Sequence, residues 1–142
     1  MKIVINACHG GFDLSPEAIK YIAKKTGETV YWFATVLSED FKIATFQPIS
    51  AEELNKSIFG VRAFKIPNPN ELTEEARREH AWNTHNIPRN DPVLVEAVEV
   101  LGQKADGDFA ELKVVEIPDD VEWVIQEYDG YEWIAEKHRT WH

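Results

Sequence analysis

Cysteine is nearly missing from this 142-residue chain, which has only Cys8. One cysteine excludes an internal disulfide and a cysteine-based metal cage, and such usage is typical of a reducing cytoplasm. Long hydrophobic runs are missing too, since no stretch approaches the roughly 18 apolar residues of a membrane helix. The opening segment Met1–Asn6 is too short and too soon polar for a signal peptide. We therefore expect a soluble, cytoplasmic protein.

Basic residues are outnumbered, with 15 lysines and arginines against 25 aspartates and glutamates, a formal net charge of −10. Residues 1–90 carry 11 acidic and 11 basic side chains, whereas residues 91–142 carry 14 and 4. This charge excludes long polyanions such as DNA as partners, but not a small anion held at a local pocket. The acidic stretch 91–136 is open to three interpretations: a solvated face, a cation site, or a surface that binds a basic protein.

Length and hydrophobic patterning predict a single globular domain over residues 1–142, of the α+β class. The expected architecture is a mixed or mainly antiparallel sheet with helices packed on one face. Strands are expected at residues 2–6, 29–37, 41–46, 61–66, 111–117 and 121–128, and helices at 15–25, from 50 onward, at 71–82 and at 91–101.

Two turns and the end of the chain complete this prediction. Ser38–Asp40 is expected to join the strands 29–37 and 41–46 as a hairpin turn. Pro118–Asp120 is expected to join 111–117 and 121–128 in the same way. After a turn at Asp129-Gly130, residues 131–141 are expected to form a short terminal helix or an arm.

Several segments near both ends of the chain form a recognisable pattern. They are Lys2–Asn6, Gly10–Phe12, Leu14-Ser15, Pro88-Arg89, Asp91–Leu94, Ala110–Pro118, Val121–Trp123, Glu127–Gly130 and Glu136–Trp141. These segments resemble a family of small uncharacterised proteins from tailed bacteriophages and prophages, and the resemblance does not extend well over residues 29–85. It implies expression in the cytoplasm of an infected or lysogenic bacterium and a role in countering host defence or adjusting host metabolism, but no established activity or catalytic residue.

A glycine-containing loop between the first strand and the first helix is the first candidate ligand site. Gly10 and Gly11 let a backbone approach a ligand, and the N–H groups of the helix after Ser15 can hold a phosphate or carboxylate. His9 and Phe12 flank the glycines. The alternative is that the glycines only make a tight turn and that Ser15 only caps the helix.

Two other places supply cationic or stacking groups. Arg89 can grip an anion with two N–H donors and Asn90 can bind an amide or base edge, or Arg89 can simply pair with acids at the helix start. The other place is the end of the chain, with Lys137, His138, Arg139 and Trp141. Basic side chains beside an aromatic ring can hold a nucleotide there, or the tryptophans can instead pack the tail onto the sheet.

Enzymatic and metal-binding motifs are not found. His80 and His85 do not have metal-ligand spacing, and His138 and His142 lie at the end of the chain. No nucleophile–base pair stands out, so we expect a binding protein, without metal or cofactor, rather than an enzyme.

Three functions remain open at this point. The first is binding, with or without sequestration, of a small anionic or nucleotide-like ligand such as a host immune signal. The second is binding and inhibition of a basic host protein by the acidic last third, in the manner of a DNA mimic. The third is a small nucleotide hydrolase that uses Asp13, His9 or carboxylates of residues 111–128. Five tryptophans also suggest an interface and hence an oligomer.

Overall fold

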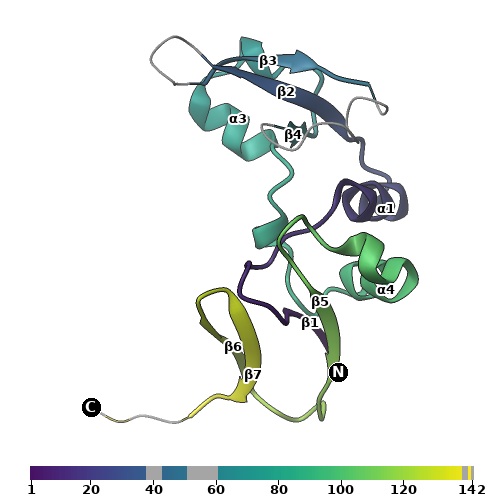
Figure 1. Ribbon diagram of the computed structural model, residues 1–142, viewed down its shortest axis with the longest axis vertical. Helices are drawn as coiled ribbons and strands as arrows, with labels where there is room; N and C mark the ends of the chain where they lie inside the picture. The colour runs from purple at the N-terminus through teal and green to yellow at the C-terminus, as the bar shows by residue number, and fades with distance from the viewer. Residues whose placement is uncertain (38–42, 51–60, 139–140, 142) are drawn as a thin grey trace. The chain divides into compact units, whose positions relative to one another are not determined.

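The computed structural model describes residues 1–37, 43–50, 61–138 and 141 and consists of two compact units (Figure 1). One unit comprises Met1–Thr26 and Asn83–His142, and the other is Gly27–Trp82. The described strands all pair antiparallel, in three small sheets accompanied by helices. The predicted α+β class with mainly antiparallel pairing is therefore confirmed, whereas the single domain stays a prediction.

Strand β1 (Lys2–Asn6) forms the centre of the first unit and pairs with β5 (Leu112–Glu116). Ile3 lies opposite Val115 and Val4 opposite Val114, so the pairing joins β-branched side chains that suit a pleated surface. Ile3 and Val4 are fully buried. The apolar run at the start of the sequence is thus a core strand, as predicted.

Two helices, α1 (Pro16–Thr26) and α4 (Pro92–Leu101), pack against each other in the same unit. Both begin with a capping side chain followed by proline, as the sequence predicts. The Ser15 hydroxyl accepts a hydrogen bond from the Ala18 N–H, and the Asp91 carboxylate accepts from Val93 and Leu94. The helices bury Ala18, Ile19, Ile22, Ala23, Leu94, Val95, Ala97 and Val98.

The prediction of a hairpin across Pro118–Asp120 is wrong, and so is the alternative of a helix after Gly130. Strand β5 pairs with β1, while β6 (Trp123–Tyr128) pairs with β7 (Tyr131–Glu136). Asp129 and Gly130 have φ values of 50° and 86°, as a two-residue type I′ turn requires. This turn matches the natural twist of the two strands, so it determines the hairpin.

The second unit is a three-stranded sheet with the order β3-β2-β4. Its core consists of Phe33, Phe46 and Phe64, with rings of neighbouring pairs in edge-to-face contact. The strands are β2 (Tyr31–Leu37), β3 (Ile43–Pro48) and β4 (Val61–Phe64), and helix α3 (Glu74–His80) follows.

The elements of this unit follow the sequence prediction with changed bounds. β2, β4 and α3 are shorter than expected, and β3 extends to Pro48 instead of ending at Phe46. The Thr73 hydroxyl caps α3 by accepting from the Ala76 N–H, so the helix begins later than the expected residue 71. The turn expected at Ser38–Asp40 and the helix expected from Ser50 onward fall on residues 38–42 and 51–60, outside the described ones. No helix in the described part of the chain is long and apolar enough to cross a membrane.

We predict that Gly130→Ala lowers the free energy of unfolding by about 2 to 4 kcal/mol, as measured by urea denaturation. The positive φ costs about 1 kcal/mol for alanine. The new Cβ would also lie 2.6 Å from the Gly11 nitrogen and from the His9 oxygen, an overlap that typically costs about 1 to 3 kcal/mol.

Gly11→Ala is the matched control, because Gly11 has a φ of 92° but open space around its missing side chain. This variant should lose only the conformational part, about 1 kcal/mol. Equal losses for the two variants would contradict the close approach of the turn to the loop after β1.

Candidate functional site

An ion pair between Arg89 and Glu132 lies at the centre of the first unit. Two parallel hydrogen bonds join the side chains, from Nη1 to Oε1 at 2.7 Å and from Nη2 to Oε2 at 2.9 Å. The side chains are only 15% and 10% exposed. Charge-assisted, bidentate pairs of this kind are among the stronger hydrogen-bonded contacts in proteins and fix the relative orientation of the two groups.

The same pair satisfies the edge of β1 that faces away from β5. The Val4 N–H donates to the Arg89 carbonyl at 2.9 Å, and the Val4 carbonyl accepts from Arg89 Nη1 at 3.2 Å. The next outward N–H on this edge, that of Asn6, donates to Glu132 Oε1 at 2.7 Å. Two side chains and one carbonyl therefore replace a neighbouring strand for β1 and attach β7 to it.

Asn6 extends this network with a fully buried side chain. Its amide NH₂ donates to the carbonyls of Cys8 and Gly130, and its Oδ1 accepts from the Glu111 N–H at 2.8 Å. Among the described residues no buried side-chain nitrogen or oxygen lacks a hydrogen-bond partner. Asn6 thus connects β1 to the hairpin turn and to the start of β5.

Arg89 also stacks on the ring of Phe12, with its guanidinium carbon 3.5 Å from the ring centroid. The same ring meets His85 edge-on at 5.9 Å. The predicted ligand residues Phe12 and Arg89 are therefore in contact, but the arginine is already engaged by a carboxylate, a carbonyl and an aromatic face. Of the two interpretations of Arg89, the structure supports pairing with an acid, although the partner is Glu132 rather than a helix-start residue. Asn90 is exposed beside it.

The loop with the glycines is closely packed. A Cβ at Gly10 would overlap the Phe109 carbonyl, and Gly11 lies against Gly130. The Ser15 hydroxyl caps α1 and donates to the Lys104 carbonyl, while the Ser15 N–H donates to Ala105. These contacts agree with the alternative of a tight turn and a cap. Ligand binding by these residues stays a prediction.

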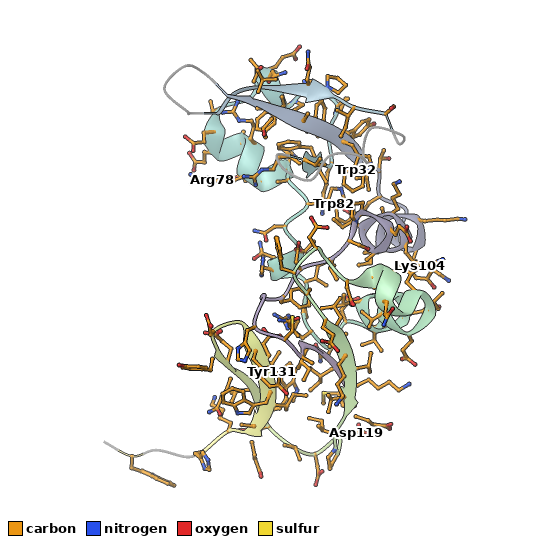
Figure 2. All side chains as sticks on the ribbon, viewed as in Figure 1. Trp32, Arg78, Trp82, Lys104, Asp119 and Tyr131 are labelled. Atoms are coloured by element: carbon orange, nitrogen blue, oxygen red, sulfur yellow. The ribbon has the colours of Figure 1, made fainter. Side chains whose placement is uncertain are left out.

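The exposed His9 is brought to the hairpin, where its ring lies 5.5 Å from that of Tyr131 (Figure 2). The C-terminal candidates Lys137, His138 and Trp141 are also exposed and follow β7, while Arg139 lies outside the described residues. Strand β7 ends at Glu136, and the described residues after it belong to no helix or strand.

The two faces of the β6–β7 hairpin differ in character. Residues directly opposite in the register share a face, so Glu132 lies with Glu127, Ile125 and Ile134 on the inner face. On the other face, Tyr128 is 72% exposed and Trp133 is 41% exposed, and the Trp133 indole donates to Gln126 at 2.9 Å. We call the set Gln126, Tyr128, Tyr131 and Trp133 the outer aromatic face.

The same hairpin carries several exposed carboxylates, on both of its faces and at its turn. Between residues 122 and 137 the sequence has five acidic side chains and one lysine, and only Glu132 of the five is buried. Among the described residues, none of the other four forms an ion pair. The hairpin therefore carries a local negative charge, on Glu122, Glu127, Asp129 and Glu136.

Two aspartates have perturbed acidity. Burial raises the pKa of the Asp13 carboxyl above its usual 3.8 and Asp108 adds to this rise, while the hydrogen bond from Leu14 and the proximity of His85 oppose it. A hydrogen bond from the Met1 ammonium, and its charge, lower the pKa of the exposed Asp119 (Figure 2). Within the described part of the chain no group of three or more His, Cys, Asp or Glu side chains is placed to hold a metal.

Sequence reasoning missed the residues that organise this site. The sequence predicts a helix or an arm at the position of Glu132 and the end of a strand at Asn6, and it nominates neither residue as part of a site. The signal that identifies the hairpin is Asp129-Gly130 between two alternating segments, which is a strong hairpin pattern.

We predict that Glu132→Gln destabilises the protein by about 3 kcal/mol, because it leaves a mostly buried guanidinium without its counter-charge. Glu74→Gln removes the exposed partner of Arg78 on α3 and should cost less than about 0.5 kcal/mol. Chemical denaturation of both variants tests this difference. A loss below about 1 kcal/mol for Glu132→Gln would contradict the organising role of the pair.

We also predict opposite titration shifts for Asp13 and Asp119 in carboxyl-detected NMR. The raised pKa of Asp13 means that its contribution to stability is present at low pH and is lost as pH rises through the window above 3.8. The lowered pKa of Asp119 means that its contribution is present above 3.8 and is lost as pH falls below that value. Asp13→Asn should remove the first dependence, and titration of both carboxyls at 3.8 would refute the prediction.

Comparison of the chain with protein-family models, with curated proteins and with solved structures finds no match. The resemblance to tailed-bacteriophage proteins therefore stays a prediction based on the residues that carry it. Two features of the molecule bear on its function: the closed Arg89–Glu132 network and the acidic, aromatic hairpin.

Proposed function

We propose that this chain is a binding protein that engages a positively charged protein through the β6–β7 hairpin. The observation that carries the proposal is the exposure of the outer aromatic face among carboxylates that no described cation neutralises. The inner face of the same hairpin is anchored by Glu132 to Arg89 and Asn6. The hairpin is thus a fixed platform whose other side is exposed, with His9 in contact with Tyr131.

Aromatic exposure of this kind is typical of protein interfaces. Tyrosine and tryptophan are enriched where proteins bind one another, because they contribute a large rigid area with few rotatable bonds. Tyr128, Tyr131 and Trp133 lie within six residues of the sequence and on one face of the hairpin. Their side chains gain contact area with a partner at a small entropic cost.

The surrounding charge selects the class of partner. Glu122, Glu127, Asp129 and Glu136 repel phosphate-bearing ligands and attract a surface rich in lysine and arginine. The anion-binding hypothesis has less support, since Arg89 already contacts Glu132 and the glycine loop is packed against Phe109. The hydrolase hypothesis is supported by no described pair of nucleophile and base.

The resemblance of the chain to phage proteins suggests the cellular context of this binding. In that context the partner is a basic protein of the bacterial cytoplasm, and binding inhibits it as a counter-defence measure. A nuclease or a DNA-binding factor has the required positive surface.

Affinity capture followed by calorimetry tests this function. The chain is immobilised and exposed to bacterial lysate at low and high salt, and a retained basic protein is then purified and titrated. We predict that Glu122→Gln/Asp129→Asn weakens this binding about fivefold, since each exposed charge contact is worth about 0.2 to 1 kcal/mol. Asparagine before Gly130 also suits a type I′ turn, so the variant keeps its hairpin.

Glu75→Gln/Glu79→Gln is the matched control, because it removes two exposed carboxylates from α3 in the other unit. It should leave the affinity unchanged. Equal weakening by both variants would point to net charge alone and would contradict a site on the hairpin. Saturable binding of cyclic or ADP-ribose nucleotides, with no basic protein retained, would favour the small-anion hypothesis instead.

A further inference from the structure

We propose that the free edge of β6 binds an extended, basic segment of the partner as an additional antiparallel or parallel strand. This inference rests on the proposed function and specifies how the partner is held. Main-chain hydrogen bonds then provide affinity, and side chains on alternate residues provide selectivity, as in other cases of strand addition.

The hairpin register determines which main-chain groups of β6 are available. In a two-residue hairpin the residues that flank the turn, here Tyr128 and Tyr131, exchange hydrogen bonds, and the pattern alternates from there. The hydrogen bond from the Lys137 N–H to the Glu122 carbonyl at 2.8 Å follows the same alternation. The N–H and C=O groups of Trp123, Ile125 and Glu127 therefore point away from β7.

Nothing in the described part of the chain pairs with that edge. β6 has β7 as its single described strand neighbour, and β7 lies between β6 and β1 (Figure 1). On the edge of β1, by contrast, Arg89 and Glu132 bind the outward groups of Val4 and the Asn6 N–H. The outward main-chain groups of β6 have no hydrogen-bond partner among the described residues, so they are a template for another extended chain.

Charge complementarity identifies the occupant. Glu122 and Glu127 lie near the two ends of β6, on opposite faces, and Val124 and Ile125 lie between them. Glu122 and Glu127 are five positions apart. In a strand that pairs with β6, two basic side chains with the same spacing can therefore lie opposite both glutamates. β-branched residues between them would face Val124 and Ile125, which is a favourable cross-strand combination.

A second copy of this chain fits the same edge poorly. Pairing β6 with another β6 brings together two hairpins that each carry four exposed carboxylates. Charged residues at an edge are a common protection against such self-association. The same charges that keep copies apart favour a strand with lysine or arginine.

Hydrogen exchange with a defined peptide tests the inference on the full chain. The probe is acetylated and amidated Lys-Thr-Val-Val-Thr-Lys, and the control is Lys-Lys-Thr-Thr-Val-Val, which has equal charge and composition but different spacing. At saturating probe, monitored by the tryptophan fluorescence of the chain, the amides of Trp123, Ile125 and Glu127 should exchange about tenfold more slowly. The control peptide should leave these three rates unchanged.

Each outcome separates this inference from the proposed function. Saturation of the fluorescence change without protection of the three amides would overturn strand addition but leave a charge-based site on the hairpin. Equal protection by both peptides would overturn the predicted spacing. Absence of binding by either peptide at millimolar concentration overturns the inference, while the capture experiment decides the proposed function independently.

A pair of variants provides a second test. Ile125→Pro removes one outward N–H that the hairpin itself does not use, so it should abolish protection of the neighbouring amides. Ile125→Ala loses more of the side chain's packing but keeps the N–H and should retain the protection. If both variants respond alike to the probe, main-chain pairing at this edge is refuted.

Discussion

The ion pair between Arg89 and Glu132 is the contact on which the first unit depends. β1 is paired with β5 on one side, and on the other it would have unsatisfied N–H and C=O groups in the core. Arg89 and Glu132 satisfy the outward N–H and C=O of Val4 and the N–H of Asn6, and at the same time they neutralise each other. Because 43 residues separate the two side chains, the pair also joins the loop before α4 to the last strand.

The use of Arg89 within the fold has an electrostatic consequence for the surface. Arg89, the cation best suited to bind an anion, is already paired with a buried carboxylate, and none of the remaining acids of the hairpin forms an ion pair with a described cation. A hairpin with this excess of negative charge is unfavourable for a phosphate ligand and favourable for a basic protein. The ion pair therefore bears on function by removing one candidate site and leaving another exposed.

Local signals in the sequence predict the local elements of this fold well. Ser15-Pro16 and Asp91-Pro92 identify α1 and α4 because a cap followed by proline acts within one turn of helix. The partner of β5 could not be predicted in this way, since β1 and the next segment both offer apolar residues and strand choice depends on contacts distant in sequence. Glu132 illustrates the same limit, because nothing beside it in the sequence indicates that Arg89 will lie against it.

The alternation of side chains along β7 is what lets one hairpin serve both stability and binding. Glu132 points inward and is held by Arg89 and by the Asn6 N–H, whereas Tyr131 and Trp133, its neighbours on either side, point outward. A two-stranded hairpin alone is marginally stable in water, so this anchoring is needed to present the aromatic side chains in one orientation. A platform ordered in advance loses less conformational entropy on binding. The polar network inside the unit and the proposed interface outside it are therefore two consequences of the same strand.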